Sequence, residues 1–256
     1  MLFFKKPGGA LLHGDCLEEM KRLPDNSIDM ILCDLPYGTT RNKWDSVLDL
    51  KLLWAEYRRI CKGSIVLTAA QPFTAVLCCS NLQDFKYQWT WVKGTKPTNF
   101  LNAKKQPLRI IEEVLVFTED EPLAEQALVF GAGDYTPQMV EGSKCHSVGK
   151  AAGGVFHQTE NYGLHSRTET AGTLKYPQDV LFFGRDKDKL HPTQKPVALF
   201  EYLIKTYTNE GALVLDNCAG SGTTAVACEN LNRRWCLIEK EQKYCEIIVT
   251  RLKGGC

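Results

Sequence analysis

The stretch ALVLDNCAGSGTT, residues 212–224, decides the fold of this 256-residue chain. Four apolar residues run into Asp216, and two glycines, Gly220 and Gly222, precede a helix-forming segment. A glycine turn between a buried strand and a helix lets the backbone of an α/β sheet approach a ligand closely. The next predicted strand ends in Glu239, a carboxylate placed to accept hydrogen bonds from ribose hydroxyls. Together the two features indicate a nucleoside site, whereas the turn taken alone is equally typical of an ordinary tight connection.

Alternating strand and helix patterns continue on both sides of this stretch. Apolar segments at 10–13, 28–33, 64–69, 85–92, 110–118, 212–216 and 235–239 are predicted strands. The predicted helices cover 16–23, 50–61, a segment after Pro72, 196–207, 223–231 and 241–252. This alternation predicts an α/β fold, a doubly wound and mostly parallel sheet with helices on both faces.

Composition excludes several classes of protein. Hydrophobic residues make up 44% of the chain, which is enough for a core and excludes disorder. No apolar run approaches the roughly 18 residues of a membrane span, and the first residues lack a secretory signal, so we expect a cytoplasmic protein without a membrane partner. The eleven cysteines are odd in number and contain no Cys-x-x-Cys pair. They indicate reduced thiols and no metal site.

The net charge of +1 hides a local imbalance. Residues 86–111 contain six basic side chains and no acid, with Trp89, Trp91 and Phe100 among them. Such a segment can hold phosphates and stack on bases, and we expect phosphate contact here, although a charge run is in general more often a solvated face. The tryptophans alternate in a predicted strand, so at least one should belong to the core. Farther along, eight glycines between 131 and 172 indicate a loop-rich insertion.

The segment Asp34-Leu35-Pro36-Tyr37-Gly38 follows directly on the predicted strand 28–33. A carboxylate, a rigid proline and an aromatic ring are thereby presented at the edge where open α/β sheets bind ligands. Methylation of an exocyclic base amine requires such a trio, because the nitrogen lone pair is delocalised into the ring. Asp34 and a neighbouring carbonyl can accept the two N–H bonds, and Tyr37 can stack on a base swung out of the helix. The alternative is a plain strand-end turn.

Four motifs in order resemble those of the permuted β class of S-adenosylmethionine-dependent DNA amino-methyltransferases. They are Gly14-Asp15-Cys16-Leu17, the Asp34–Gly38 segment, His191-Pro192-Thr193-Gln194-Lys195-Pro196, and the segment 216–224. The resemblance implies a Rossmann-like methyltransferase domain formed by 1–118 and 179–256, with a target-recognition insertion at 119–178.

The resemblance also implies roles for individual residues. Asp34 and the carbonyl of Leu35 would hold the target amine, while Pro36 shapes the turn and Tyr37 stacks on the base. The residues implied in S-adenosylmethionine binding are Asp15 and Cys16 at the adenine, Glu239 at the ribose, Asp216, Gly220, Gly222 and Thr223 around the methionine portion, and His191, Thr193 and Lys195 closing over it.

The implied reaction is methyl transfer to adenine N6 of a flipped base in double-stranded DNA, as in restriction-modification systems, because Asp at the first catalytic position is associated with adenine. Three alternatives stay open: transfer to cytosine N4, a catalytically idle DNA-binding module of the same fold, and a transferase for RNA or a protein amide. Members of this class often pair, which makes a homodimer a candidate assembly.

Overall fold

A computed structural model of the chain describes residues 1–38, 45–94, 97–118, 135–142, 156–159, 163–166, 173–186, 190–191 and 193–254. The chain divides into two units. The larger unit combines Met1–Thr136 with Asp179–Cys256, and the smaller consists of Pro137–Gln178.

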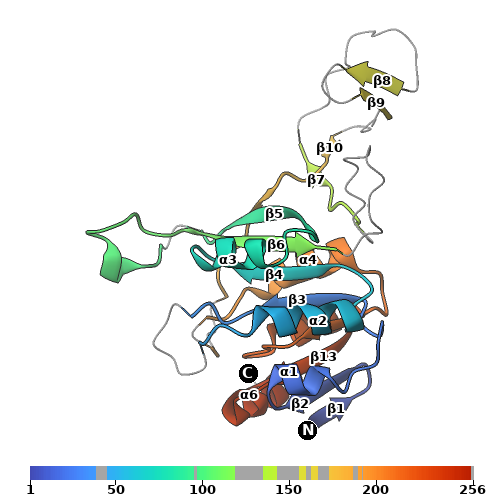
Figure 1. Cartoon of the computed structure of the whole chain (residues 1–256), viewed down its shortest axis with the longest axis vertical. Helices are drawn as coiled ribbons and strands as arrows, with labels where there is room; N and C mark the ends of the chain where they lie inside the picture. Colours follow the sequence, from blue (N-terminus) through green and yellow to red (C-terminus); the bar gives the residue numbers. More distant parts are fainter. Residues whose placement is uncertain are drawn as a thin grey trace. The chain divides into compact units, whose positions relative to one another are not determined.

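One sheet organises the larger unit (Figure 1). In the described part of the chain it has nine strands in the order β1-β2-β13-β12-β3-β4-β6-β5-β11. The strands are β1 (Leu2–Lys6), β2 (Gly9–His13), β3 (Met30–Asp34), β4 (Ile65–Ala69), β5 (Phe85–Val92), β6 (Ile111–Phe117), β11 (Val180–Phe182), β12 (Leu213–Asp216) and β13 (Arg234–Glu239). β1 and β6 run antiparallel to their neighbours, and the other pairs are parallel.

Helices cover both faces of this sheet. The helices are α1 (Cys16–Met20), α2 (Leu50–Ile60), α3 (Phe73–Ser80), α4 (Val197–Tyr207), α5 (Thr223–Asn230) and α6 (Gln242–Leu252). α1 to α3 supply one buried apolar cluster and α4 to α6 the other. Strand β3 contributes to both clusters because successive side chains of a strand point to opposite faces. Met30 and Leu32 belong to the cluster on the α4–α6 side, and Ile31 and Cys33 to the cluster on the α1–α3 side. A strand buried on both faces is a continuous apolar run, as the sequence of β3 is.

The predicted α/β class with a mostly parallel, doubly wound sheet is confirmed. The predicted strand and helix segments lie where the sequence patterns place them, within a few residues at the ends. Two strands of this sheet were not predicted, β1 and the three-residue β11, and they form its two outer edges. Trp89 and Trp91 are both buried, which confirms the expectation of at least one core tryptophan.

Strand direction places the functional motifs together. β2, β13, β12, β3 and β4 are mutually parallel, so their carboxyl ends lie at one edge of the sheet. Asp34, Asp216 and Glu239 are the last residues of β3, β12 and β13. In open α/β sheets this edge is the one that binds ligands. No helix in the described part of the chain is long and apolar enough to cross a membrane.

The smaller unit contains two short antiparallel pairs. β7 (Val140–Glu141) pairs with β10 (Leu174–Lys175), and β8 (Phe156–Thr159) pairs with β9 (Gly163–Ser166). Much of the glycine-rich segment predicted as a target-recognition insertion lies outside the described residues. That role stays a prediction.

Candidate functional site

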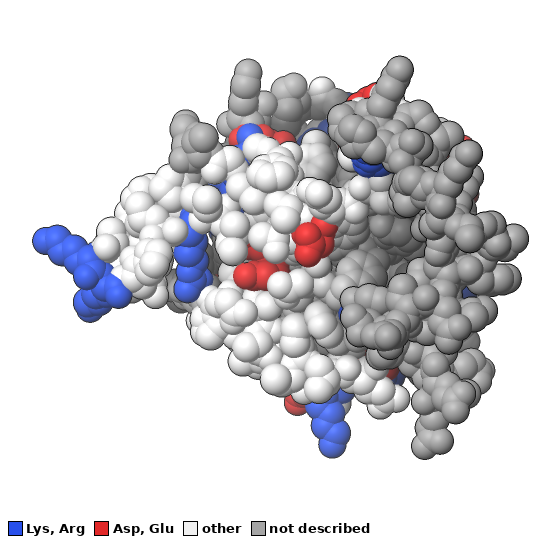
Figure 2. Space-filling view, turned by 90° about the horizontal axis from the view of Figure 1, so that it is seen from above, with Lys and Arg blue, Asp and Glu red and all other residues white. Residues whose placement is uncertain are grey.

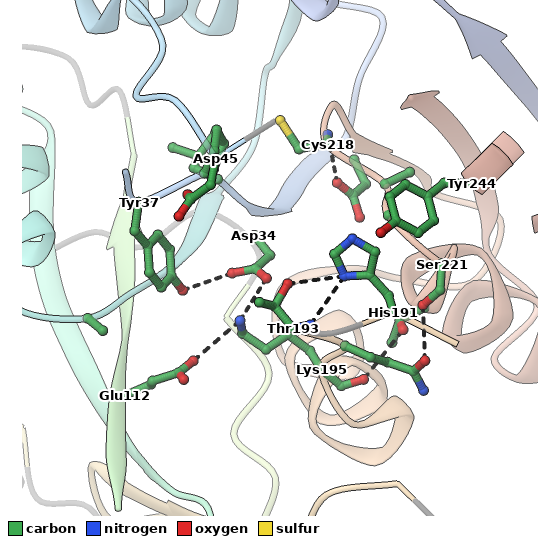
Figure 3. Close-up of a pocket in the computed structure, with 18 of the residues that line it drawn as sticks. Asp34, Tyr37, Asp45, Glu112, His191, Thr193, Lys195, Cys218, Ser221 and Tyr244 are labelled. Atoms are coloured by element: carbon green, nitrogen blue, oxygen red, sulfur yellow. Dashed lines mark hydrogen bonds and ion pairs between the residues drawn. The ribbon is translucent and has the colours of Figure 1, made fainter. Parts of the chain in front are cut away.

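A cavity of about 660 Å³ opens at the carboxyl edge of the sheet, and residues from both ends of the chain line it (Figure 3). The lining includes thirteen of the fourteen predicted site residues: Asp15, Cys16, Asp34, Leu35, Pro36, Tyr37, His191, Thr193, Lys195, Asp216, Gly220, Thr223 and Glu239. Gly222 is the exception, because it packs against Ile248 of α6 behind the cavity wall. The predicted catalytic and cofactor segments therefore share one cavity.

Asp34 stands at the centre of the site, at the end of the buried strand β3. Its Oδ1 accepts hydrogen bonds from the hydroxyls of Tyr37, at 2.8 Å, and Thr68, at 2.5 Å. Its Oδ2 accepts from Lys195 Nζ at 2.7 Å. A carboxylate has about four lone-pair positions, so about one remains for a substrate donor. Three neighbours thus fix the orientation of Asp34 before any substrate arrives.

The ring of Tyr37 lies between the turn and α3. It stacks on Phe73 with the ring centroids 5.3 Å apart and an interplanar angle of 23°. Burial and the charge of Asp34 raise the pKa of the Tyr37 hydroxyl well above its usual range. The hydroxyl therefore stays protonated and donates to Asp34, while Phe73 holds the ring in place.

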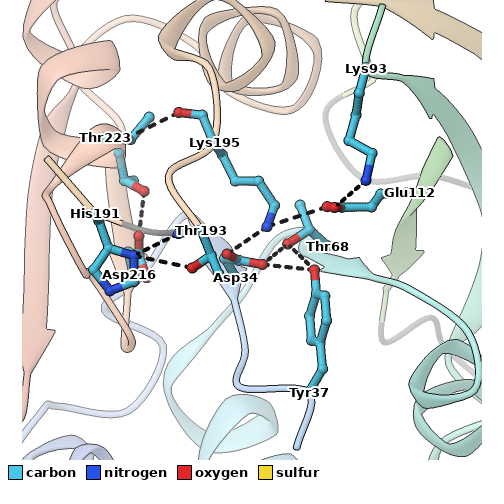
Figure 4. Close-up of polar contacts among 11 residues, drawn as sticks. Asp34, Tyr37, Thr68, Lys93, Glu112, His191, Thr193, Lys195, Asp216 and Thr223 are labelled. Atoms are coloured by element: carbon cyan, nitrogen blue, oxygen red, sulfur yellow. Dashed lines mark hydrogen bonds and ion pairs between the residues drawn. The ribbon is translucent and has the colours of Figure 1, made fainter. Parts of the chain in front are cut away.

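A row of buried charges extends from Asp34 away from Asp216 and His191 (Figure 4). Lys195 Nζ lies 2.7 Å from Asp34 Oδ2 and 3.3 Å from Glu112 Oε2. Glu112 Oε1 is in turn 2.8 Å from Lys93 Nζ. Lys195 and Lys93 are each 6% exposed. The signs alternate along the row, so each charge has a partner of opposite sign.

The protonation states of this row follow from the pairing. Burial opposes the charge on Glu112, yet Lys195 and Lys93 hold the pKa of its carboxyl below the usual value. Burial likewise opposes the ammonium of Lys195, but Asp34 and Glu112 raise its pKa. Both groups are charged at neutral pH.

Lys93 corrects one sequence-based expectation. It belongs to the basic stretch that was predicted to hold phosphates, but its ammonium is buried and bound to Glu112. For Lys93 the phosphate prediction is wrong, because an internal carboxylate on the neighbouring strand takes up its charge. The structure also places the Lys195 ammonium on Asp34, whereas the motif resemblance assigned that residue to the cofactor.

The glycine loop before α5 depends on backbone conformation. Gly220 and Gly222 have φ values of +52° and +76°, in the left-handed region that favours glycine. A Cβ on Gly222 would lie 3.0 Å from the Ile248 side chain. Glu239 fastens the loop, since its Oε2 accepts from Gly220 N at 2.8 Å and its Oε1 from Glu241 N at 2.8 Å. Burial raises the pKa of Glu239.

Asp216 is a second buried carboxylate at this loop, with 3% of its surface exposed. Its Oδ1 accepts from Cys218 N at 3.1 Å, and its Oδ2 accepts from the Thr224 hydroxyl. Burial raises the pKa of Asp216 to about 6. Its charge is therefore sensitive to modest changes of pH.

His191 and Thr193 form the wall opposite the glycine loop. His191 Nδ1 accepts from Thr193 N at 3.3 Å and lies 3.1 Å from Thr193 Oγ1, while the ring packs edge-on against Tyr244 at 4.3 Å. Burial lowers the pKa of His191 to about 4. The imidazole is therefore neutral at pH 7 and serves as an acceptor that orders the loop.

Asp15 and Cys16 start α1 at the far end of the cavity. Asp15 Oδ1 accepts from Leu17 N at 3.0 Å and caps the helix. Asp15 Oδ2 is 3.4 Å from Lys240 Nζ. The second oxygen of Asp15 thus faces the segment that follows Glu239.

Several residues of the site were not predicted. Thr68 donates a hydrogen bond to Asp34, and Glu112 forms an ion pair with Lys195. The Tyr57 hydroxyl donates to Asn217 Oδ1 at 2.6 Å. The one available signal was pairing: a hairpin of the predicted strands 85–92 and 110–118 places Glu112 opposite Trp91 and next to Lys93. No sequence pattern indicated a role for Tyr57, because its hydrogen-bond partner Asn217 lies 160 residues farther along the chain.

The chemistry of the lining fits S-adenosylmethionine better than a phosphorylated nucleotide. Asp15, Asp216 and Glu239 give this half of the cavity three carboxylates. Carboxylates accept hydrogen bonds from hydroxyls and amines and attract cationic groups, but they repel phosphate. The nearby Lys195 ammonium is taken up by Asp34 and Glu112. A cationic nucleoside that carries a ribose diol and an amine suits this donor and acceptor set.

Comparison with known proteins agrees with this assignment. Residues 28–250 match the model of an N6/N4 methyltransferase family described as DNA methylase. The chain is 29% identical to the DNA adenine methyltransferase YhdJ of Escherichia coli K12 over 97% of its own length and 84% of that protein. It is 25% identical to the type II methyltransferase M.HpaI of Haemophilus parainfluenzae, over 94% of the chain and 73% of that protein.

Solved structures share the fold. The M1.HpyAVI complex with S-adenosylmethionine matches with a TM-score of 0.57 and 24% identity, and covers 95% of this chain and 99% of that one. The cytosine-N4-specific PvuII DNA methyltransferase matches with a TM-score of 0.61 and 16% identity, over 96% and 93% of the two chains.

Proposed function

Since the chain belongs to the N6/N4 DNA methylase family, we propose that it transfers a methyl group from S-adenosylmethionine to the exocyclic N6 of a flipped adenine in duplex DNA. The observation that carries this proposal is the place of Asp34. Its carboxylate is fixed by three neighbours, keeps an accepting position, and faces the same cavity as the glycine loop and the carboxylates of Asp216 and Glu239. An amine held at Asp34 would thus lie in the same cavity as a bound methyl donor.

The cofactor would be held by the segments that the motifs predict. Glu239 would accept from the ribose hydroxyls, and Asp15 with the backbone at Cys16 would meet the adenine. The loop of Asp216, Gly220, Gly222 and Thr223 would surround the methionine portion, with His191 and Thr193 opposite. When bound, S-adenosylmethionine supplies an electrophilic methyl group on a sulfonium.

Around the substrate, the chain's own residues orient one nitrogen. Asp34 and the carbonyl of Leu35 accept the two N–H bonds of the amine, which favours a tetrahedral nitrogen whose lone pair is free to attack. As the nitrogen forms its bond to the methyl group, the methyl–sulfur bond of the bound donor would break and leave a neutral thioether. The amine would give up one N–H proton, to the Asp34 carboxylate that accepts it or to solvent. The rigid turn at Pro36 and the Tyr37 ring, backed by Phe73, hold the base plane. Preorganised geometry supplies much of the rate.

Two observations favour adenine over cytosine. Asp34 occupies the first catalytic position, where aspartate is associated with adenine in the family that the motifs resemble. The relative with 29% identity is an adenine methyltransferase by name. The cytosine-N4-specific enzyme shares the fold at 16% identity, which carries no argument about the base.

The segment 119–178 is proposed to read the target sequence, because it follows the catalytic half of the domain and forms largely its own unit. A cytoplasmic location and a homodimeric assembly also stay proposals. They rest on the sequence patterns and on the family resemblance.

The test of the proposal is transfer of labelled methyl from S-adenosylmethionine to unmethylated duplex DNA, beside matched RNA and protein samples. Incorporation into DNA alone is expected. Tight binding of cofactor and duplex without transfer to any sample would instead support an idle binding module. Incorporation into RNA or protein alone would contradict the DNA assignment.

We expect the affinity for the cofactor to depend on pH through Asp216. Its raised pKa means that the carboxylate is charged above about pH 6 and protonated below. If the charged form holds the cationic cofactor, affinity should be constant above about pH 7 and weaken by up to about tenfold per pH unit below pH 6. Calorimetric Kd values between about pH 5 and pH 8 measure this dependence. Asp216→Asn should flatten the curve, and an unchanged curve in that variant would assign the titration to another group.

A further inference from the structure

The connection between β5 and β6 forms an arm that we define as residues 97–110. Its base is closed by two backbone bonds, from Thr98 N to Arg109 O at 2.8 Å and from Arg109 N to Thr98 O at 3.1 Å. A short 3-10 turn, η1 (Phe100–Asn102), lies beyond the base. The arm projects from the larger unit in green in Figure 1. β5 runs parallel to β4, so the arm starts at the sheet edge that carries Asp34.

The two sides of the arm differ in chemistry. The side toward the cavity is polar and consists of Thr98, Asn99, Asn102, Gln106 and Arg109, all of which line the cavity. The outer side carries exposed lysines at 104 and 105 and a phenylalanine ring, Phe100, that is 64% exposed. The arm contains no acid. Figure 2 shows basic side chains gathered on this projection, with acidic side chains inward of it.

Asn99 precedes η1 in a left-handed backbone conformation, and its side-chain amide has an N–H donor without a hydrogen-bond partner among the described residues. Its φ of +71° lies in the left-handed region, which asparagine tolerates, and Phe100 follows at once. Its Oδ1 accepts from Asn102 Nδ2 at 2.8 Å, whereas its own Nδ2 is buried and has no hydrogen-bond partner among the described residues. A buried amide donor that lines an open cavity and has no partner indicates that a ligand oxygen or ring nitrogen completes it.

We propose that the arm is a DNA-binding element in which Lys104 and Lys105 contact the phosphates of the duplex, and Phe100 inserts into the space that the flipped base leaves in the stack. This inference rests on the proposed function, because it assigns a duplex with an extruded base to the cavity. Apolar side chains inserted between base steps are a general means of stabilising distorted DNA. Cations beside such a wedge supply affinity for the backbone, and Asn and Gln amides can contact base edges.

The composition of the arm distinguishes duplex DNA from an apolar protein partner. A solvent-exposed aromatic ring that served a protein interface would be expected in an apolar surround, with few charges at its centre. Here the exposed ring shares a short segment with Lys104, Lys105 and Arg109, with three amide side chains and with two partly exposed aliphatic residues, Leu108 and Ile110. Charged and amide side chains outnumber the exposed large apolar ones, and no acid balances the positive charge. Positive charge, amides and one ring beside the cavity match a polyanion with stacked bases.

The insertion is tested with full-length Phe100→Ala on two duplexes that contain the sequence methylated by the wild type. In one duplex the target base is paired, and in the other it is mispaired and already loosened. On the paired duplex the variant should transfer methyl about tenfold more slowly than the wild type, and the mispaired duplex should restore most of that loss. A merely structural defect would slow both substrates equally.

Two matched controls sharpen this test. Leu82→Ala removes a side chain that is 69% exposed at the opposite sheet edge, and Phe182→Ala removes a ring that is 76% exposed on β11, outside the arm. Both should behave as the wild type. An unchanged rate for Phe100→Ala on the paired duplex, or a loss in Phe182→Ala instead, would overturn the assignment of the wedge.

The phosphate contacts are tested by the salt dependence of duplex binding, which does not require methyl transfer. The double variant Lys104→Gln with Lys105→Gln should lower the slope of log affinity against log salt by about 2, because each phosphate contact contributes about 0.9. Lys62→Gln with Lys205→Gln, the same charge change at the opposite edge, should leave the slope unchanged. Equal slopes for wild type and arm variant would overturn this assignment. Methylation of DNA by the wild type reports separately on the proposed function.

Discussion

Replacing Asp34 with alanine is expected to lower the rate of methyl transfer by about 10³-fold while cofactor affinity changes little. The reason is the geometry of the carboxylate, which is fixed by Tyr37, Thr68 and Lys195 and offers its remaining position to the target amine. Without it, only the carbonyl of Leu35 is left to accept from the amine, and the Lys195 ammonium loses one of its two partners. Single-turnover rates with saturating cofactor measure the effect.

Two variants accompany this measurement. Asp34→Asn keeps the shape but removes the charge and one accepting group, so its rate should also fall by more than about 10²-fold. Asp25→Asn removes an exposed carboxylate that pairs with Arg59 away from the cavity, and it should be active. Retention of most activity in Asp34→Ala, with the fold intact, would remove Asp34 from the reaction.

Lys195→Met is expected to give the second large effect, a fall in kcat of about 10²-fold together with a loss of stability of about 3 kcal/mol. The substitution leaves the carboxylates of Asp34 and Glu112 in a buried site without the cation between them. Asp34 then loses a partner that fixes its orientation. Thermal unfolding and single-turnover kinetics measure the two effects.

Glu112→Gln and Lys195→Met together form a double-mutant cycle that measures the coupling between the two side chains. The double variant of Lys195→Met and Glu112→Gln should be less damaged than the sum of the single variants, because removing both members leaves fewer unpaired buried charges. The cofactor Kd should stay within about threefold of the wild type in all of them. An unchanged kcat together with a weakened cofactor Kd would instead place Lys195 at the cofactor, as the motif alone implies.

The sequence predicted the framework of the fold because its strong signals are local. Continuous apolar runs such as 30–33 and 213–215 mark strands buried on both faces, and the intervening helices show their own periods. The outer strands β1 and β11 were missed because both are largely exposed and β11 has only three residues, so neither periodicity nor burial distinguishes them from loops. Edge strands are defined by their neighbours more than by their own residues.

The residues of the site likewise fall into those that local sequence signals predict and those that only the fold brings together. Asp34, Asp216 and Glu239 could be predicted because each is the last residue of its strand, and strand direction alone brings the three together. The row from Lys195 to Lys93 could not. A hairpin of the predicted strands 85–92 and 110–118 suggests a pairing, but the sequence patterns do not fix its register, and Lys195 lies on a loop more than eighty residues later in the chain. In one dimension Lys93 and Glu112 look like members of separate charge runs. Only the fold makes them partners.

The most direct test of the central claim is mass analysis of the nucleosides from unmethylated duplex DNA after incubation with S-adenosylmethionine and either the wild-type chain or Asp34→Ala. The account predicts N6-methyladenine with the wild type and none above background with the variant. N4-methylcytosine as the product, or equal N6-methyladenine from both proteins, would contradict it.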